Sequence, residues 1–443
     1  MSAGLLSILL FGALMLLLST GLPVVFVLGG VSVVFFTWLF GWDATAGLFL
    51  AEYKMFSHEV LLALPLFLLM GAVLQNSGIG DAAYGMFHRW MGGLNGGLAM
   101  GTVLVCTVFA AMTGVSGAAT VAMTLVAVPA MIKRGYDKHL AVGCVAVSGP
   151  LGILIPPSVI LIIYGLLTHV SVGHLFMGGV FPGLLISLLF ITFIGIRCWR
   201  NPQSGPALSL EERATWHEKL VSLRAIVLPM IVVFSVLGAI YTGIATPTES
   251  AAVGAFMSFI CAAIHRRLSW AVFKSTIIQT LKVTGMVFWL TGAAICFGNL
   301  YTQIGARDLM ESMITGLQVN PWIVQIIMQL SIIIFGCFID DFAMIMILIP
   351  IYAPISLMLG FDPVWFGIVL TININIAVVT PPYGFNLFYI RGAISMIRDQ
   401  IPEDITMGDL YRSVLPFIPL QILGLAIVMV FPQLATWLPG KMF

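Results

Sequence analysis

The sequence predicts an all-α membrane protein that crosses the lipid bilayer many times. Of its 443 residues, 60% are hydrophobic and 8% are charged, whereas a soluble domain carries about 25% charged residues. The mean hydropathy is +1.09, and apolar runs of about 20 residues, the length of one helical span, recur along the chain. These runs, such as LLALPLFLLMG at 61–71, lack the period-two alternation of an outer-membrane barrel.

Twelve apolar segments follow one another along the chain. We expect them at about 3–20, 22–41, 59–76, 97–132, 139–166, 172–197, 224–244, 248–264, 270–299, 320–355, 363–390 and 412–437. The first Lys or Arg is Lys54, so no positively charged region precedes the first segment. We therefore expect the N-terminal segments to be retained and not cleaved as a secretory signal.

A polar stretch at 198–223 divides the chain near its middle. It is too short for a domain, and we expect a cytoplasmic linker with an amphipathic helix from about Leu208. The predicted organisation is a first membrane repeat at 1–197 and a second membrane repeat at 224–443.

Two of the segments are too long for one crossing, and each contains a polar interruption. Segment 97–132 is interrupted by MTGVSG at 112–117, and segment 320–355 by GCFIDD at 336–341. We predict two re-entrant helical hairpins. Backbone of this kind is tolerated at membrane depth only where protein buries it or an aqueous cavity adjoins it.

Two further segments contain a helix break. Segment 139–166 carries GPLGILIPPS at 149–158, and segment 363–390 carries VVTPPYGFN at 378–386. Proline interrupts helical hydrogen bonding, so each segment is predicted to be a discontinuous helix. Such a helix leaves unpaired N–H groups on one side of the break and unpaired C=O groups on the other. The N–H ends attract anions such as a carboxylate, and the C=O ends attract cations such as Na⁺.

The two halves resemble each other at a constant offset of 225 in the numbering. The offset relates turn and break residues in a single frame: Gly80 to Gly305, Asn95 to Asn320, Gly135 to Gly360, Asp137 to Asp362, and Pro156-Pro157 to Pro381-Pro382. The hairpin and the discontinuous helix are therefore each predicted to occur twice.

Charge predicts that the two repeats are inverted in the membrane. MIKRGYDKH, after the first hairpin, has three Lys/Arg, and ISLMLGFDP, after the second, has none. The positive-inside rule places the first connection in the cytoplasm and the second outside. Threaded this way, the chain has fifteen Lys/Arg inside and three outside (Lys54, Arg307 and Lys441), with Lys282 left within a span. Both termini are then predicted to be periplasmic.

The candidate ligands are the polar residues of the interruptions and breaks. In the first half they are Thr113, Gly114, Ser116, Thr120, Ser148, Gly149, Gly152, Pro156 and Ser158. In the second half they are Asp340, Asp341, Asn373, Asn375, Thr380, Pro381 and Asn386. A carboxylate at membrane depth costs about 2.5–3.5 kcal/mol on insertion scales, so a cation or a donor partner is expected for each acid. The alternative roles are close packing for the small hydroxyl residues and helix capping for the acids.

Other functional classes lack their motifs in this sequence. It contains no phosphate loop, nucleophile elbow or HExxH motif, so an enzyme is not expected. The six cysteines, including Cys337, show no CxxC pairing, and no transition-metal site or cofactor is expected. A net charge of +1 gives no reason to expect nucleic acid. Glu249 is expected to cap the following helix through Thr246 or Thr248.

Six stretches in order resemble the large membrane subunit of TRAP transporters, the tripartite ATP-independent periplasmic transporters. They are LLALPLFLLMG, SGAATVA, the KRGYD–GPLGILIPPS block, ATPTESAAVGA, GFDPVWFGIVL and VVTPPYGFNLF. The resemblance implies uptake of an organic acid across the bacterial inner membrane, driven by a Na⁺ gradient. It also implies a periplasmic substrate-binding protein, a small four-helix membrane subunit on a separate chain, and an elevator in which hairpins and broken helices move as a unit.

On the family pattern, Na⁺ is held where each hairpin tip faces a break. The resemblance implies the following Na⁺ ligands: Thr113, Gly114, Ser116, Gly149, Gly152, Pro156, Gly336, Asp340, Thr380 and Pro382. The remaining polar residues are substrate candidates: Thr120, Ser148, Ser158, Asp341, Asn373, Asn375 and Asn386. The chain departs from the family at Asp341, where many members lack a second acid.

A second interpretation stays open. A stand-alone Na⁺-coupled anion or dicarboxylate symporter would share this architecture and need no binding protein. A channel would not need two opposed hairpins.

Overall fold

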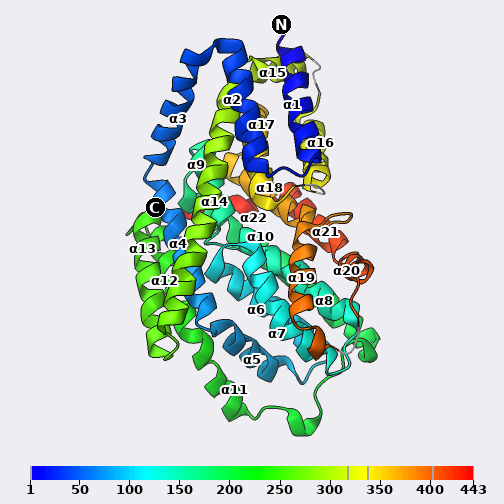
Figure 1. Cartoon of the computed structure of the whole chain (residues 1–443). Coiled ribbons are helices and arrows are strands. Elements are labelled where there is room, and N and C mark those ends of the chain that lie inside the picture. The colour runs from blue at the N-terminus through cyan, green and yellow to red at the C-terminus, as the bar shows by residue number, and fades with distance from the viewer. Residues whose placement is uncertain (1, 317–318, 337–338, 402–403, 443) are drawn as a thin grey trace.

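The computed structural model describes residues 2–316, 319–336, 339–401 and 404–442, which fold into helices and connecting turns without a strand among them (Figure 1). The helices of the first half are α1 (Ala3–Ser19), α2 (Val24–Phe40), α3 (Ala46–Phe56), α4 (Val60–Asn76), α5 (Ile79–Met91), α6 (Gly97–Thr113), α7 (Ser116–Ile132), α8 (Lys138–Ser148), α9 (Val159–Thr168) and α10 (Val172–Arg200). The later helices are α11 (Trp216–Ser222), α12 (Arg224–Tyr241), α13 (Pro247–Ile264), α14 (Trp270–Gln303), α15 (Ala306–Gly316), α16 (Pro321–Gly336), α17 (Asp341–Met358), α18 (Pro363–Ala377), α19 (Phe385–Met396), α20 (Met407–Val414), α21 (Ile418–Val430) and α22 (Gln433–Thr436).

Both long segments contain two helices. The first pair is α6 and α7, separated by Gly114 and Val115, and the second is α16 and α17, separated by 337–340. Both discontinuous helices are also present. The first is α8 and α9 with a 3₁₀ turn at Gly149–Ile153, and the second is α18 and α19. The break residues Pro156-Pro157 and Pro381-Pro382 each join through a cis peptide bond.

Helix bounds in the two halves repeat with the offset seen in the sequence. Adding 225 to the bounds of α7 gives 341–357, and α17 spans Asp341–Met358. Adding 225 to the bounds of α9 gives 384–393, and α19 spans Phe385–Met396. The opposite orientation of the repeats in the membrane stays a prediction.

The offset of 225 does not preserve every helix boundary, and the long helix α14 is an exception. Its counterpart in the first half is the pair formed by α3 and α4, which bend by 57° at the break between Phe56 and Val60. α14 instead continues unbroken for 34 residues and packs against both α2 and α4 (Figure 1). α14 therefore packs against the helices on both sides of the bend, α3 and α4.

Three helices lie outside the predicted segments. α3, α5 and α15 carry charged residues within short apolar stretches, for example His88 and Arg89 in α5 and Asp308 in α15. These charges interrupt the apolar runs on which the segment prediction depends. The last predicted segment, 412–437, is divided at Leu415–Phe417 and at Phe431–Pro432.

The linker also differs from its prediction. α10 continues to Arg200, so the linker begins at Asn201, and the expected helix begins at Trp216 and not near Leu208. Its start is set by a capping box in which Thr215 and Glu218 bond reciprocally. The predicted cap of α13 is confirmed, because Thr246 and Glu249 form the same arrangement.

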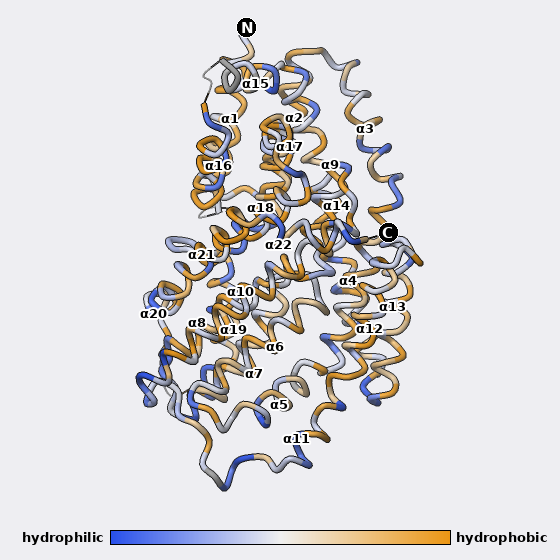
Figure 2. The backbone as a smooth tube through the Cα atoms, turned by 180° about the vertical axis from the view of Figure 1, so that it is seen from behind, coloured by the Kyte–Doolittle hydropathy of each residue, from blue (hydrophilic) through white to orange (hydrophobic). Residues whose placement is uncertain are grey.

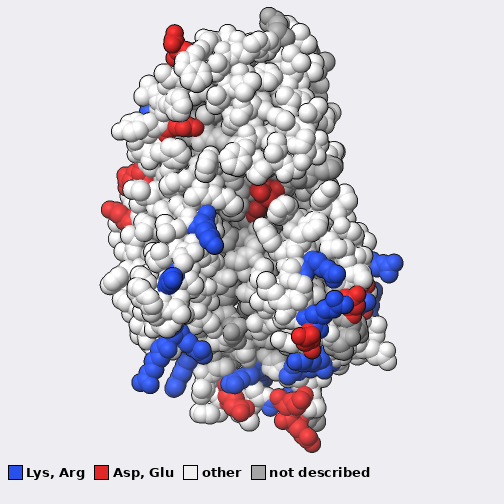
Figure 3. All heavy atoms as spheres, viewed as in Figure 1, with Lys and Arg blue, Asp and Glu red and all other residues white. Residues whose placement is uncertain are grey.

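The surface matches a chain surrounded by lipid. Within the described residues, six helices are long and apolar enough to cross a membrane, or seven if the bent pair counts as one span. Figure 2 shows hydrophobic backbone throughout the body of the molecule, and Figure 3 shows Lys and Arg gathered over its lower half, toward the end where α5 and α11 lie. The five described cysteines are buried and unpaired, and Cys337 lies outside the described residues.

Candidate ion and substrate site

The first hairpin tip lies directly against the first helix break. The carbonyl of Gly114 accepts a hydrogen bond of 3.1 Å from the N–H of Val159, the first residue of α9. A Cβ built on Gly152 would lie 2.8 Å from the carbonyl oxygen of Val115, so the 3₁₀ turn also touches the tip. The structure therefore brings together the tip residues and the break residues that the sequence singles out in the first half.

Two glycines make this close approach feasible. Gly114 has φ of 68°, a left-handed conformation, and a Cβ there would lie 2.5 Å from the carbonyl oxygen of Pro157. A Cβ on Gly149 would lie 2.0 Å from Oγ1 of Thr120. At both positions a side chain would push the break away from the hairpin.

The hydroxyl groups of the first half bond mostly to backbone carbonyls. Thr113 donates to Phe109 at 3.0 Å and Thr120 to Ser116 at 3.0 Å. Ser148 donates to Cys144, and Ser158 donates to Ile153. The hydroxyl oxygens keep lone pairs for a further partner, and the set carries no formal charge.

The second tip carries the acids. Asp340 is the N-cap of α17 and accepts a hydrogen bond of 2.7 Å from the N–H of Ala343. In the facing break, Thr380 donates to Ile376 at 2.7 Å, and Pro382 accepts a hydrogen bond from the hydroxyl of Tyr411. Gly336 packs against Ala377 at the end of the first half-helix, because a Cβ on Gly336 would lie 2.1 Å from that of Ala377.

Asp341 and Ser116 join the two hairpins. The hydroxyl of Ser116 donates to Oδ2 of Asp341 at 2.7 Å, and each residue is 5% exposed. The predicted ion ligand Ser116 and the predicted substrate ligand Asp341 are thus direct partners.

The three predicted asparagines face neighbouring helices. Asn373 donates to the backbone oxygen and to Oε1 of Gln329 in α16, at 2.6 and 2.7 Å. Asn375 accepts from Gln421 in α21 at 3.2 Å, and Asn386 donates to the carbonyl of Ala146 in α8 at 2.8 Å. Gln329 and Gln421 are not among the candidates from the sequence, although a glutamine within an apolar run is the signal that would have found them.

The two tips differ in the space around them. A cavity of about 20 Å³ adjoins Thr113 and Val115 at the first tip, between α4 and α14. A cavity of about 880 Å³ adjoins Asp340 at the second tip and extends between α14 and the connection from α1 to α2. The cavity beside Thr113 is therefore much smaller than the cavity beside Asp340.

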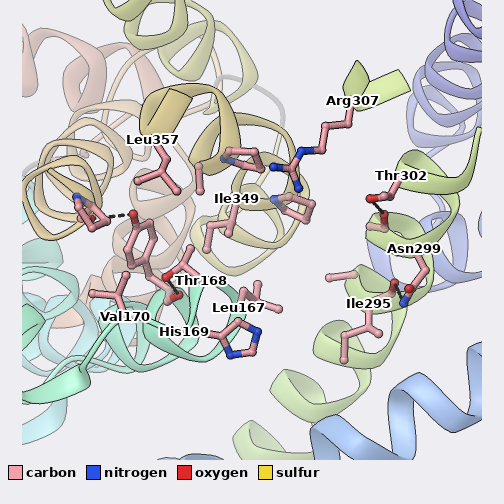
Figure 4. A pocket seen from close by; sticks show the side chains of 17 residues that line it. Leu167, Thr168, His169, Val170, Ile295, Asn299, Thr302, Arg307, Ile349 and Leu357 are labelled. Atoms are coloured by element: carbon pink, nitrogen blue, oxygen red, sulfur yellow. Dashed lines mark hydrogen bonds between the residues drawn. The ribbon is translucent and has the colours of Figure 1, made fainter. Parts of the chain in front are cut away.

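Another cavity lies near the opposite end of α17. It measures about 520 Å³ and separates α9 and α17 from α14 and α15. Figure 4 shows Arg307 reaching over it, with Thr302 and Asn299 on one side and His169 nearer α9. The cavity lies beside the connections from α9 to α10, α14 to α15 and α17 to α18. The charge pattern predicts that all three connections lie outside the cell membrane.

The sequence model of one protein family matches residues 11–434 of the chain, and that family is described as the tripartite ATP-independent periplasmic transporter, DctM component. The chain belongs to the DctM family. The resemblance to the large TRAP subunit is confirmed, and DctM proteins are components of transporters, which agrees with the expectation that the chain is not an enzyme.

Individual DctM proteins are similar over most of their length. The C4-dicarboxylate TRAP transporter large permease protein DctM of Pseudomonas aeruginosa is 33% identical over 405 residues, which cover 91% of each chain. The isethionate TRAP transporter permease protein DctMQ of Oleidesulfovibrio alaskensis is 33% identical over 385 residues, which cover 86% of this chain and 58% of that longer protein. The YdaH transporter of Alcanivorax borkumensis has a similar fold, with a TM-score of 0.66, 13% identity and coverage of 90% and 91%.

Proposed function

We propose that this DctM protein is the translocating subunit of a Na⁺-driven transporter that takes up an organic acid delivered by a periplasmic binding protein. The observation that carries the proposal is the meeting of the first hairpin tip with the first break, where Gly114 bonds Val159. A second hairpin and a second break repeat these elements in the other half of the chain. Paired hairpins and broken helices near the bilayer midplane are the framework on which secondary transporters bind ions and substrate.

Sodium fits the groups that the two tips provide. Na⁺ is a hard cation that takes oxygen ligands, as Ca²⁺ and Mg²⁺ do. The first tip offers hydroxyl and backbone oxygens around Ser116 and Gly149, and the second adds the carboxylate of Asp340. The Na⁺ ligands proposed from the family pattern therefore remain Thr113–Ser116 with Gly149–Pro157, and Gly336–Asp340 with Thr380–Pro382.

An organic anion would be attracted by the positive N-terminal end of α7, which begins at the first hairpin tip. The N-terminal end of α17 is capped by Asp340 and is proposed to hold the cation instead. The relatives are named for C4-dicarboxylate and for isethionate, both organic anions. Ser158 and Thr120 remain substrate candidates in this region, whereas Asn373 and Asn375 are engaged with neighbouring helices.

The difference between the tips supports alternating access. The large cavity beside Asp340 reaches the connection from α1 to α2, which the positive-inside threading places in the cytoplasm. We therefore propose that this conformation faces inward. Movement of the hairpins and broken helices as one body, the elevator motion, would close this cavity and open the core toward the cavity near Arg307 and His169.

The partners follow from the family. DctM is one component of a three-part transporter, and the O. alaskensis relative joins M and Q in one longer chain. We propose a separate small membrane subunit and a periplasmic binding protein, in the bacterial inner membrane. The stand-alone symporter remains the second candidate. YdaH is a transporter with a similar fold, but at 13% identity this similarity concerns the fold alone.

Reconstitution tests the proposal. The chain is placed in proteoliposomes with its small subunit, and uptake of labelled succinate and isethionate is measured with the binding protein present or omitted. We expect uptake only with external Na⁺ and with the binding protein. Equal uptake in K⁺ or choline would contradict Na⁺ coupling, and Na⁺-driven uptake without the binding protein would favour the stand-alone symporter.

A further inference from the structure

The hydrogen bond between Ser116 and Asp341 connects equivalent positions of the two halves. Ser116 is the first residue of α7 and Asp341 is the first residue of α17. Their numbers differ by 225, which is also the offset of the repeat. A residue can meet its own counterpart only where the axis relating the two halves passes between them, so this contact lies at the centre of the paired hairpins.

The same bond joins the two proposed ion sites. Ser116 belongs to the first tip, and Asp341 directly follows Asp340, the acid of the second tip. Resting on the proposed function, we infer that the Ser116–Asp341 bond couples the two sites, so that Na⁺ binds them cooperatively. Asp341 is then a positioning residue that acts through Ser116 and does not itself contact the substrate.

The physical basis is that one hydroxyl can serve two partners. The hydroxyl of Ser116 donates a hydrogen bond to Asp341, and its oxygen lone pairs stay available for a cation. A cation on that oxygen polarises the O–H bond and strengthens its hydrogen bond to the carboxylate, as hydrogen-bonded chains do. The carboxylate also attracts the cation and reduces its repulsion of a second cation near Asp340.

The burial of the pair makes this coupling effective. Ser116 and Asp341 are each 5% exposed, so water screens their interaction little. The N-terminal ends of α7 and α17 carry partial positive charge and would disfavour two nearby cations. The carboxylate of Asp341 lies at the start of α17 and accepts a hydrogen bond from Ser116 at the start of α7. Its single negative charge therefore offsets the partial positive charges of both helix ends.

The second acid, Asp341, by which the chain departs from the family pattern, supplies the charge that couples the two sites. The first half has a neutral serine at this position and the second half has an acid. Two serines could bond but would bring no charge, and two acids would repel each other. Coupling between sites is reciprocal, and coupling free energies in proteins correspond to about 5- to 150-fold in affinity.

Equilibrium binding of radioactive Na⁺ to the purified full-length chain tests the inference without any knowledge of the substrate. We expect a Hill coefficient clearly above 1 for the unaltered protein and a value near 1 for Asp341→Asn, which leaves every proposed Na⁺ ligand in place. Ser116→Ala should also give a value near 1, but it removes a proposed Na⁺ ligand together with the hydrogen bond. Ser116→Thr keeps the hydroxyl and should retain cooperativity. As a matched control, Ser187→Ala removes a buried hydroxyl that bonds Thr107 at 2.8 Å, away from the tips, and should also retain it.

The double variant sharpens the result. Ser116→Ala with Asp341→Asn should bind Na⁺ no less cooperatively than either single variant, because both remove the same connection. A variant enters the comparison only if its melting temperature matches that of the unaltered protein and it elutes as a single species in size exclusion. If Ser116→Ala does not fold, the test depends on Asp341→Asn and Ser116→Thr. A Hill coefficient of 1 in the unaltered protein, or unchanged cooperativity in Ser116→Ala and Asp341→Asn, would overturn the coupling alone. Absence of Na⁺ binding in the unaltered protein would overturn the proposed function itself.

Discussion

Adding one methyl group at Gly149 should separate the first helix break from the first hairpin. A Cβ at this position would lie 2.0 Å from Oγ1, 2.9 Å from Cβ and 3.0 Å from Cα of Thr120. Ordinary van der Waals contact begins at 3.4 Å, so all three contacts are too short and the first falls short by more than a third of that distance. The side chain of Thr120 has little freedom to move, because its hydroxyl bonds the carbonyl of Ser116 within the buried core.

The expected cost of Gly149→Ala is that of overpacking a close-packed core, about 1–3 kcal/mol. If the shift falls on the proposed ion site, this energy corresponds to about 5- to 150-fold weaker Na⁺ binding. If it falls on the whole fold, the melting temperature decreases. Gly149→Ala combined with Thr120→Ala removes the closest contact and should recover part of either loss.

Two measurements check this prediction. Thermal unfolding followed by intrinsic fluorescence reports the fold, and the Na⁺ concentration for half-maximal binding reports the site. Gly238→Ala is the matched control, because a Cβ on Gly238 in α12 would meet no atom within 4 Å. An unchanged melting temperature together with unchanged Na⁺ affinity in Gly149→Ala would refute the close packing of break and hairpin.

The remaining predictions address the second tip, the asparagines and the topology. Asp340→Asn should raise the half-saturating Na⁺ concentration about 10- to 150-fold, because a charged partner contributes about 1.5–3 kcal/mol. The melting temperature without Na⁺ should not change, because Asn also caps helices. Unaltered Na⁺ affinity would assign Asp340 to capping alone. Asn373→Ala should lower stability by about 1–3 kcal/mol, because it leaves the Gln329 oxygens without their partner, with Na⁺ affinity unchanged; a loss of substrate or Na⁺ affinity at full stability would place Asn373 in the site. In a cysteine-free background, Lys133→Cys should react with an impermeant thiol reagent only from the cytoplasm and Leu357→Cys only from the periplasm. Labelling of both variants from the same side would contradict the inverted orientation of the two halves.

Sequence reasoning is most successful at the turn and break residues. The interruption at 112–117 and the breaks at 149–158 and 378–386 contain glycine or proline, and the interruption at 336–341 contains Gly336 and the helix-capping Asp340. The backbone effects of these residues are local. The structure ends and restarts helices at all four. α3, α5 and α15 escape prediction because a charged, partly apolar helix lying beside the spans lacks the long hydrophobic run that identifies a span.

The sequence does not predict which neighbouring helix each polar side chain contacts. Asn373 and Asn375 stand two positions apart on one helix, so they point about 200° apart and reach different neighbours. Sequence reasoning assigns both to the substrate, and packing decides that one meets Gln329 and the other Gln421. The offset of 225 predicts that Ser116 and Asp341 are equivalent positions, but only the packing of the two halves shows that they touch.

Accumulation of substrate against its own gradient tests the central claim most directly. Proteoliposomes holding the complete transporter are first equilibrated with equal Na⁺ on both sides, and the internal and external concentrations of labelled substrate are compared. An inward Na⁺ gradient is then imposed. We predict a ratio near one without the gradient and accumulation that grows with the gradient and collapses when a Na⁺ ionophore is added. Accumulation that persists without a Na⁺ gradient, or that never exceeds equilibrium with one, would contradict it.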